Sequence, residues 1–273
     1  HTRSYSVTGV QTCTLPIYTA FHQSMPKHAY MYAIPQKYYD EYGIRKYGFH
    51  GTSHKFVAQA AADYLKRPLE DLNLITCHLG NGSSIAAIQG GKVLDTTMGL
   101  TPLPGVIMGT RCGDIDPAII FFLARKGMTI DEIDNVLNKQ SGLMGVNGIG
   151  SDDMRDTVNA AAQGKAAAEN ALNMFGHRAA LYIGGYHTLL GGADAIIFTG
   201  GIGENSFPGR KAILTRLEAI GCKIDEAKNK SVFGTLGVVS TEASKIPAIV
   251  IPTNEELMIA RETFRLLAAT LKK

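Results

Sequence analysis

Two apolar segments that each run directly into a glycine-rich stretch constrain the fold of this chain most. They are "NLITCHLGNGSS" (residues 73–84) and "ADAIIFTGGIGENS" (residues 193–206). Glycine adds no side-chain bulk and tolerates positive φ, so backbone N–H groups in such bends can approach an anion closely. Open sheets place ligands at the carboxyl ends of their strands. Each bend alone also fits a plain hairpin turn or close packing, but two in one sheet predict a phosphate site.

The strand pattern predicts a mixed sheet. Residues 73–80, 84–89 and 92–98 form a three-stranded meander, joined by an Asn-Gly turn and by Gly90-Gly91. Residues 193–200 and 246–252 read as two further buried strands. Helical segments separate them, so the fold class is α/β, a mixed sheet flanked by helices.

Helix signals fill the rest of the chain. One helix starts near Ser53 and is ended by Pro68, another starts at Pro117, and Thr129 with Glu132 forms a capping box. A helix is expected over residues 152–162, with Ser151 or Asp152 as its cap. A longer one is expected over 165–190, where Gly184-Gly185 kinks the helix or allows close packing. The last helix is expected over 255–271.

Composition excludes several classes of function. The net charge of +3 is spread along the chain, so no nucleic-acid partner is expected. No apolar stretch is long enough for a membrane span and no signal peptide is evident, which predicts a cytoplasmic protein without a membrane partner. The four cysteines are widely spaced, so neither a zinc site nor a disulfide framework is expected.

Three further segments carry candidate chemistry. "GFHGTSH" presents His50 and His54 at a helix start, where a capping or core role competes with catalysis. "MGTRCGDIDP" places Arg111 beside glycines, free to pair with phosphate oxygens or simply solvated. Glu255, after "IPTN", can bind Mg²⁺ near nucleotide phosphates or can complement the dipole of the last helix.

Seven segments in one order resemble the acetate kinase family along residues 19–273. They are "TAFHQSMP", "YGFHGTSH", "HLGNGSS", "MGTRCGDIDP", "SDDMRD", "TGGIGENS" and "PTNEEL". The resemblance implies the ribonuclease-H-like architecture that sugar kinases, actin and the Hsp70 ATPase share. It also implies that ATP or ADP is held in a cleft between two domains.

The resemblance further implies a role for individual residues. His50 and Arg111 would stabilise the transferred phosphoryl group, Phe49 and Pro102 would border the acyl pocket, and Glu255 would serve Mg²⁺, with Mn²⁺ as an alternative. The nucleotide site would be lined by His78, Leu79, Gly80, Asn81, Gly82, Asp153, Met154, Arg155, Gly201, Ile202, Gly203, Glu204 and Asn205.

The reaction implied is ATP plus acetate giving ADP plus acetyl phosphate, and its reverse. Physical chemistry agrees, because a carboxylate is already ionised at neutral pH and needs no strong general base. The transferring group needs neutralisation of the charge on its equatorial oxygens, which Arg, His and Mg²⁺ can supply.

The start of the chain departs from the family. Residues 1–17 have no structural period and resemble a translated sequencing adapter, so we expect a foreign leader or a disordered terminus. The family aspartate before "TAFH" is replaced by Tyr18. Residues 18–273 are thus expected to be the second domain of an acetate kinase, inactive alone. The last-helix stripe of Leu257, Ala260, Phe264, Leu267 and Leu271 is expected to pack toward the missing first domain.

Two other functions remain open from the sequence. One is an actin-like or Hsp70-like module that binds nucleotide without transferring phosphate, which Tyr18 favours. The other is propionate kinase, because one methylene changes binding by only about 1–3 kcal/mol and the motifs do not separate the two acids. Family members are usually homodimers joined through the second domain, so the same is expected here.

Overall fold

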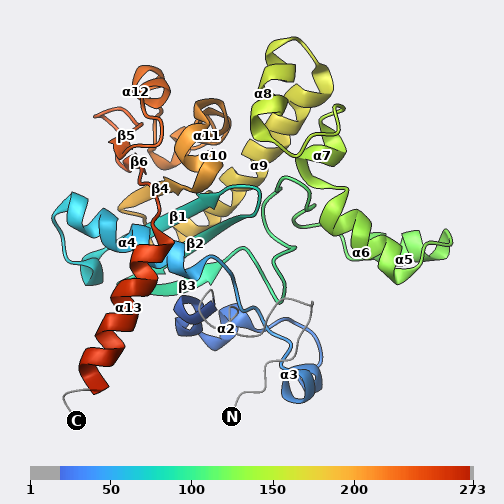
Figure 1. Ribbon diagram of the computed structural model, residues 1–273, viewed down its shortest axis with the longest axis horizontal. Coiled ribbons are helices and arrows are strands. Elements are labelled where there is room, and N and C mark those ends of the chain that lie inside the picture. Colours follow the sequence, from blue (N-terminus) through green and yellow to red (C-terminus); the bar gives the residue numbers. More distant parts are fainter. Residues whose placement is uncertain (1–18, 271–273) are drawn as a thin grey trace.

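A single six-stranded sheet with helices on both faces organises the protein (Figure 1). The computed structural model describes residues 19–270. The expected leader (residues 1–17), Tyr18 and Leu271 therefore lie outside the described residues.

The predicted meander forms one half of the sheet. β1 (Asn73–Leu79) pairs antiparallel with β2 (Ser83–Gln89), which pairs antiparallel with β3 (Lys92–Thr96). The β1–β2 turn consists of residues 80–82, so the predicted Asn-Gly turn is confirmed.

The other half is mainly parallel. β4 (Ala195–Thr199) pairs parallel with β1, and β6 (Ala248–Val250) pairs parallel with β4. The short β5 (Gly237–Val238) closes the edge, which gives the order β3-β2-β1-β4-β6-β5. The carboxyl ends of β1, β4 and β6 consequently meet at one edge of the sheet.

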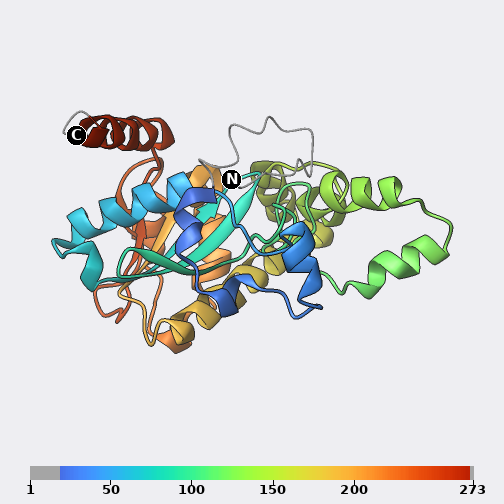
Figure 2. The same cartoon turned by 90° about the horizontal axis from the view of Figure 1, so that it is seen from below.

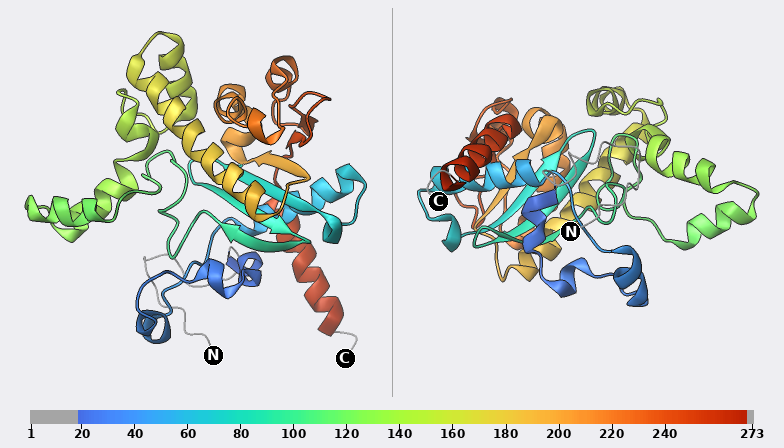
Figure 3. Two further views of the ribbon diagram at one scale, coloured as in Figure 1. Left: turned by 180° about the vertical axis from the view of Figure 1, so that it is seen from behind. Right: turned by 60° about the horizontal axis from the view of Figure 1, so that its bottom comes forward.

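Alternate residues of the strands feed two apolar layers, as the period of two in a strand requires. On one face Leu74 and Ile197 pack with α4 (Gly51–Leu65). On the other face Ile75 and Phe198 pack with α9 (Ala166–Leu189) and α11 (Phe207–Leu214). Figure 3 shows α9 crossing the sheet from behind. The ribonuclease-H-like mixed sheet implied by the resemblance is thereby confirmed.

Four helices follow the meander in the sequence and precede α9. They are α5 (Ala118–Arg125), α6 (Ile130–Lys139), α7 (Gly142–Val146) and α8 (Met154–Ala162). The capping box of Thr129 and Glu132 is present at α6. The predicted cap of α8 at Ser151 or Asp152 was wrong: Asp153 caps it, because its side chain accepts a hydrogen bond from the backbone N–H of Arg155. Figure 2 shows α5 and α6 projecting away from the sheet.

Two predictions about glycines were also wrong. The stretch after β4 is not an open turn but the helix α10 (Gly200–Asn205), which starts directly at the strand end. Gly184 and Gly185 do not interrupt α9, and a Cβ added to either would meet no atom within 4 Å, so they mediate no close packing. Gly176 does so instead, because a Cβ there would meet the backbone of Ala212 on α11.

The smaller elements surround the sheet. They are η1 (Ala20–Ser24), α2 (Lys27–Tyr30), α3 (Lys37–Tyr42), η2 (Leu69–Asp71), η3 (Glu218–Ile220) and α12 (Glu226–Ser231). No helix in residues 19–270 combines the length and the apolar character that crossing a membrane requires.

The last helix, α13 (Glu255–Thr270), lies against α4. Lys55 and Glu262 form an ion pair of 2.9 Å between the two helices. In the predicted stripe, Leu257, Phe264 and Leu267 are exposed, Phe264 by 75%. Their packing toward another domain stays a prediction.

Candidate functional site

The two glycine-rich stretches adjoin at the carboxyl ends of β1 and β4. Gly200 has φ +76°, and a Cβ on it would lie 2.8 Å from the carbonyl oxygen of Leu79. A Cβ on Gly80 would lie 3.8 Å from the backbone nitrogen of Gly201. Only glycine allows β1 and α10 to approach so closely, so the predicted convergence of the two bends is present.

Gly80 and Gly82 tolerate positive φ but do not adopt it here. The backbone of Gly82 lies close to two predicted site residues: a Cβ there would lie 3.3 Å from Nη1 of Arg111 and 3.5 Å from Nε2 of His50. The hairpin therefore brings one guanidinium and one imidazole together over its own backbone.

The loop that carries Arg111 is held by the α6–α7 junction. Gly142, at φ +62°, packs on the carbonyl oxygens of Met108 and Arg111. Its neighbour Leu143 donates a backbone hydrogen bond to Met108, and Cys112 donates one to Leu137. These contacts fix the main chain on both sides of Arg111.

Arg111 is a partly buried cation, and its hydrogen bonds to the described residues go to uncharged atoms. Nη1 donates to the carbonyl oxygen of Pro102 at 3.3 Å and to Sδ of Met108 at 3.6 Å. No carboxylate in the described part of the chain forms an ion pair with it. Burial lowers the pKa of Arg111, but a guanidinium stays protonated at neutral pH. Arg111 is thus available to an anion.

His50 precedes α4 in a left-handed conformation, at φ +58°. Its ring stacks on that of His78, with centroids 4.1 Å apart and planes at 19°. Nδ1 of His50 lies 2.9 Å from Oγ of Ser84. Burial, with the neighbouring His78 and Arg111, lowers the pKa of His50 well below its usual value. His50 therefore contributes a hydrogen-bonding ring and not a charge.

His78 is tied to the end of β6. Its Nδ1 lies 2.8 Å from Oγ of Ser53, and that hydroxyl donates to Oγ1 of Thr253 at 2.9 Å. Burial lowers the pKa of His78 to about 4. The motif predicted for nucleotide contacts thus also holds His50 in place.

Asn81, at the tip of the hairpin, connects two other predicted site segments. Its Nδ2 donates to Asp152 at 3.1 Å, and its carbonyl oxygen accepts from the backbone of Gly109 at 3.1 Å. Next to Asp152, Arg155 is exposed and pairs with Asp153, whose pKa that pairing lowers. The hairpin, the Arg111 loop and the start of α8 therefore form one surface.

Glu204 was among the residues expected to line the nucleotide site, and one oxygen of its carboxylate is engaged within the protein. Oε1 accepts from the backbone N–H groups of Gly200 (2.9 Å) and Thr253 (3.1 Å). Asn205 likewise donates to the carbonyl oxygen of Gly201. Glu204 hence joins the ends of β4 and β6.

The remaining predicted nucleotide residues differ in their access to a ligand. Gly201 is exposed, and a Cβ added to it would meet no atom within 4 Å. Leu79 and Met154 are core residues, Gly203 is buried, and Ile202 packs against the core. Of these, Leu79 and Met154 can reach a nucleotide only through backbone atoms.

Phe49 and Pro102 are connected to His50 and Arg111 through main-chain atoms: Phe49 directly precedes His50, and Pro102 contacts Arg111. The carbonyl oxygen of Phe49 accepts from Nε2 of the buried His22 at 2.7 Å, and that of Pro102 accepts from Arg111. Both side chains are partly buried. Their place at an acyl pocket stays a prediction.

Glu255 is suited to a magnesium ion. It follows the loop of Thr253, and its carboxylate forms no hydrogen bond or ion pair with any of residues 19–270. Burial raises the pKa of this unpaired carboxyl. Mg²⁺ typically takes one or two carboxylates and completes its shell with phosphate and water. The described residues contain no cluster of three or more His, Cys, Asp or Glu side chains for a metal, so a protein-only cage is not found there.

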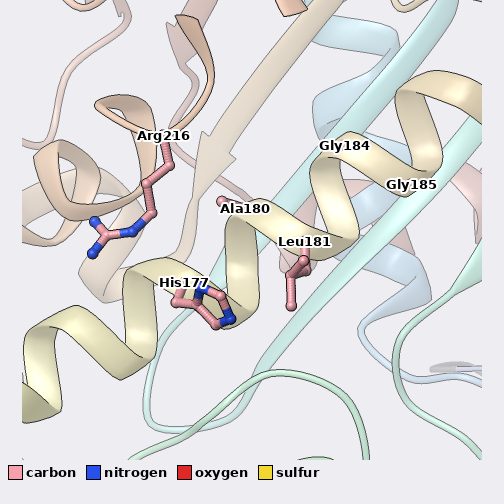
Figure 4. A pocket seen from close by; sticks show the side chains of 6 residues that line it. All are labelled: His177, Ala180, Leu181, Gly184, Gly185 and Arg216. Atoms are coloured by element: carbon pink, nitrogen blue, oxygen red, sulfur yellow. The ribbon is translucent and has the colours of Figure 1, made fainter. Parts of the chain in front are cut away.

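Two hollows lie elsewhere. One of about 430 Å³ runs along α9 between His177 and Arg216 (Figure 4). Another of about 600 Å³ lies near His187 and Lys245. Neither is lined by a predicted site residue.

Sequence reasoning missed the hydroxyl groups of the site. Hydroxyl groups hold both stacked histidines: Ser84 pairs with His50 and Ser53 pairs with His78. Ser53 also donates to Thr253, 200 residues further along the chain. Ser53 and Ser84 do lie inside "GFHGTSH" and "HLGNGSS", but only the histidines and glycines of those motifs were interpreted.

The fold and the arrangement of these loops place the chain in the ribonuclease-H-like class. The sequence model of the Acetokinase family matches residues 9–261. The chain belongs to the acetokinase family.

Individual relatives support the same family assignment. The chain is 56% identical over 246 residues to an acetate kinase of Clostridium novyi, and 55% identical over 255 residues to one of Methanosarcina thermophila. These matches cover 90% and 93% of this chain, but 61% and 62% of the relatives. The chain therefore spans about three fifths of the length of these relatives.

Solved structures give the same result. A Porphyromonas gingivalis acetate kinase superimposes with a TM-score of 0.88 at 42% identity, covering 91% of this chain and 62% of that one. A Francisella tularensis propionate kinase gives 0.84 at 46% identity, covering 89% and 62%.

Proposed function

We propose that this chain carries the nucleotide-binding and phosphoryl-transfer surface of an acetate kinase, which converts ATP and acetate to ADP and acetyl phosphate. The observation that carries the proposal is the meeting of Arg111, His50 and Gly82 beside two adjoining glycine-rich strand ends. The names of the relatives support acetate as the acceptor.

In this mechanism backbone N–H groups of Asn81, Gly82 and Gly201 bind the nucleotide phosphates, because those of Gly80 and Gly200 already donate to Gly82 and Glu204. Arg111 neutralises charge on the equatorial oxygens of the transferring group, and Nε2 of His50 donates a hydrogen bond to it. Mg²⁺ or Mn²⁺ bound at Glu255 would neutralise further phosphate charge. The acetate carboxylate is the nucleophile and attacks in line, while ADP leaves.

Two assays test the proposal. Calorimetric titration with ADP and Mg²⁺ should show saturable binding, and a hydroxamate assay reports acetyl phosphate. Formation of acetyl phosphate would exclude a module that only binds nucleotide, whereas binding without product is also expected of a second domain that is inactive alone. No binding at all would contradict the proposal. Repeating the assay with propionate tests the second candidate, which the 46% identity to a propionate kinase supports.

We further propose a cytoplasmic homodimer with no nucleic-acid or membrane partner. Exposed apolar side chains on α5, Phe121 at 61% and Phe122 at 54%, support a partner surface. Light scattering that gives a strict monomer would remove the dimer.

A further inference from the structure

A continuous line of buried hydrogen bonds ends at His50. Oγ1 of Thr76 on β1 lies 2.7 Å from Nδ1 of His54 on α4. Nε2 of His54 lies 2.8 Å from Oγ of Ser84 on β2, and the same Oγ lies 2.9 Å from Nδ1 of His50. Thr76, His54 and Ser84 are fully buried. The line thus connects the middle of the sheet to the candidate site.

Each link in this line contains one proton. A hydroxyl group has one proton to donate, and a neutral imidazole has one N–H and one lone pair. Burial lowers the pKa values of both His54 and His50 well below the usual value, so both rings are neutral at pH 7. If Ser84 accepted from both rings, its own buried proton would have no acceptor within residues 19–270, and it cannot donate to both. All links therefore point the same way, either toward His50 or away from it.

The buried end of the line decides its direction. In residues 19–270, Oγ1 of Thr76 has His54 as its sole hydrogen-bond partner. If the line points toward His50, Thr76 donates to His54, His54 donates to Ser84 and Ser84 donates to His50. If the line points away from His50, the hydroxyl proton of Thr76 is buried without an acceptor, which native proteins avoid.

We propose that Thr76, His54 and Ser84 are positioning residues that hold His50 in the tautomer with its proton on Nε2. Nε2 is the ring atom that faces Gly82, next to Arg111. In this tautomer His50 offers an N–H donor toward the site, whereas the other tautomer would offer a lone pair that repels phosphate oxygens. That consequence for phosphoryl transfer rests on the proposed function, but the tautomer itself does not.

The stacked ring of His78 provides an internal comparison. Ser53 donates its hydroxyl proton to Thr253, so Nδ1 of His78 must donate to Ser53. His78 is therefore expected to carry its proton on Nδ1, the opposite of His50. The hydroxyl partner of each ring, and not burial alone, then sets its tautomer.

Long-range ¹H–¹⁵N correlation spectra of the ¹⁵N-histidine-labelled chain, without nucleotide, test this directly. The ring signals of His50 are identified by their loss in His50→Gln. The expected result is a protonated Nε2 and an unprotonated Nδ1 for His50 in the wild-type chain. A protonated Nδ1 would overturn the proposal. Because no nucleotide or turnover is involved, this outcome is independent of the assays of the proposed function.

Variants test the cause. Ser84→Ala removes the hydrogen-bond donor to Nδ1 of His50 and should produce an Nδ1–H form of this ring. Thr76→Val keeps the side-chain shape but removes the buried hydroxyl that sets the direction of the line, so it should weaken the preference of His50 for Nε2–H. Thr76→Val carries the test if Ser84→Ala does not fold. Ser53→Ala is the matched control and should alter His78 while His50 stays unchanged. Retention of a single His50 tautomer in the folded relay variants, or an equal change in Ser53→Ala, would overturn the assignment.

Discussion

Arg210 is fully buried and holds Asn229 with two hydrogen bonds, from Nε to Oδ1 at 2.8 Å and from Nη2 to the backbone oxygen at 2.7 Å. Its Nη1 donates to the last carbonyl groups of α10, Gly203 and Glu204, at 2.9 Å each. Burial lowers the pKa of Arg210 to about 10. One guanidinium therefore fixes α10, the helix that the second glycine-rich stretch forms.

Removal of this side chain should be among the most destabilising substitutions. Arg210→Met leaves several buried acceptors unpaired, at about 1–3 kcal/mol each, so a loss of about 3–5 kcal/mol is expected in urea unfolding. Arg210→Lys should lose less, because it retains a cation but not the fork of donors. The control is Arg216→Met, at an exposed arginine that also bonds a helix carbonyl. Equal effects at both positions would contradict the role of Arg210.

Local sequence patterns predicted most of the helices and strands but few of the hydrogen bonds that hold the site together. The meander, α6 and α9 follow from hydrophobic period and capping residues, which are local properties of the chain. The contact between Ser53 and Thr253 joins residues 200 positions apart, and Glu204 meets Thr253 across 49. Such pairs arise only when parallel strand ends meet at the same edge, so no local pattern contains them.

The glycines show the same division. "TGGIGENS" was correctly placed at a strand end, yet its helix was missed because glycine has a low helix propensity. The helix forms there because Arg210 and Glu204 satisfy its terminal groups, which is a tertiary effect. Gly82 has no positive φ, and its backbone is approached by Arg111 and His50, a contact that no local pattern contains.

Gly142→Ala should displace the loop of Arg111. The φ of +62° costs an alanine about 1–2 kcal/mol, and its Cβ would in addition meet the carbonyl oxygens of Met108 and Arg111. Gly191→Ala is a matched control, with φ +68° and no atom within 4 Å of a Cβ. Thermal unfolding should show a clearly larger loss for Gly142→Ala. Similar losses of stability in the two variants would mean that the positive φ alone, and not the contact with Met108 and Arg111, causes the effect.

Stability should fall in mild acid because of His22. This ring is fully buried, and burial lowers its pKa from 6.5 to about 4. Between those values the unfolded chain binds the proton more readily, so stability is complete above pH 6.5 and decreases as the pH falls to about 4. The group contributes about 3 kcal/mol to this loss. Urea unfolding at pH 7, 5.5 and 4 measures it.

A substitution separates His22 from the other titrating groups. His22→Leu should reduce the slope of stability against pH over this window, even where it lowers stability overall. His28→Gln, at an exposed histidine, should leave the slope unchanged. An unaltered slope in His22→Leu would assign the acid sensitivity to other residues.

Glu255→Gln should uncouple nucleotide binding from the divalent ion. The unpaired carboxylate is expected to hold Mg²⁺ beside the phosphates, so the variant should gain little ADP affinity when Mg²⁺ is added. Glu256→Gln, at the exposed neighbouring position, is the control and should respond to Mg²⁺ as the wild type does. Calorimetric titration with and without Mg²⁺ measures both. Identical behaviour of the two variants would exclude Glu255 as the ligand.

Substitution of Arg111 and of Arg155 should affect the binding of ATP and ADP differently. Arg111 has no carboxylate partner among the described residues and faces Gly82, whereas Arg155 is exposed and paired with Asp153 at the start of α8. If Arg111 meets the transferring group, Arg111→Gln should weaken a non-hydrolysable ATP analogue by about 10- to 100-fold, the value of a charge-assisted hydrogen bond, and ADP far less. Arg155→Gln should weaken both nucleotides to a similar, smaller extent. An equal loss for both nucleotides in Arg111→Gln would move this residue away from the transferred phosphoryl group and toward general nucleotide binding.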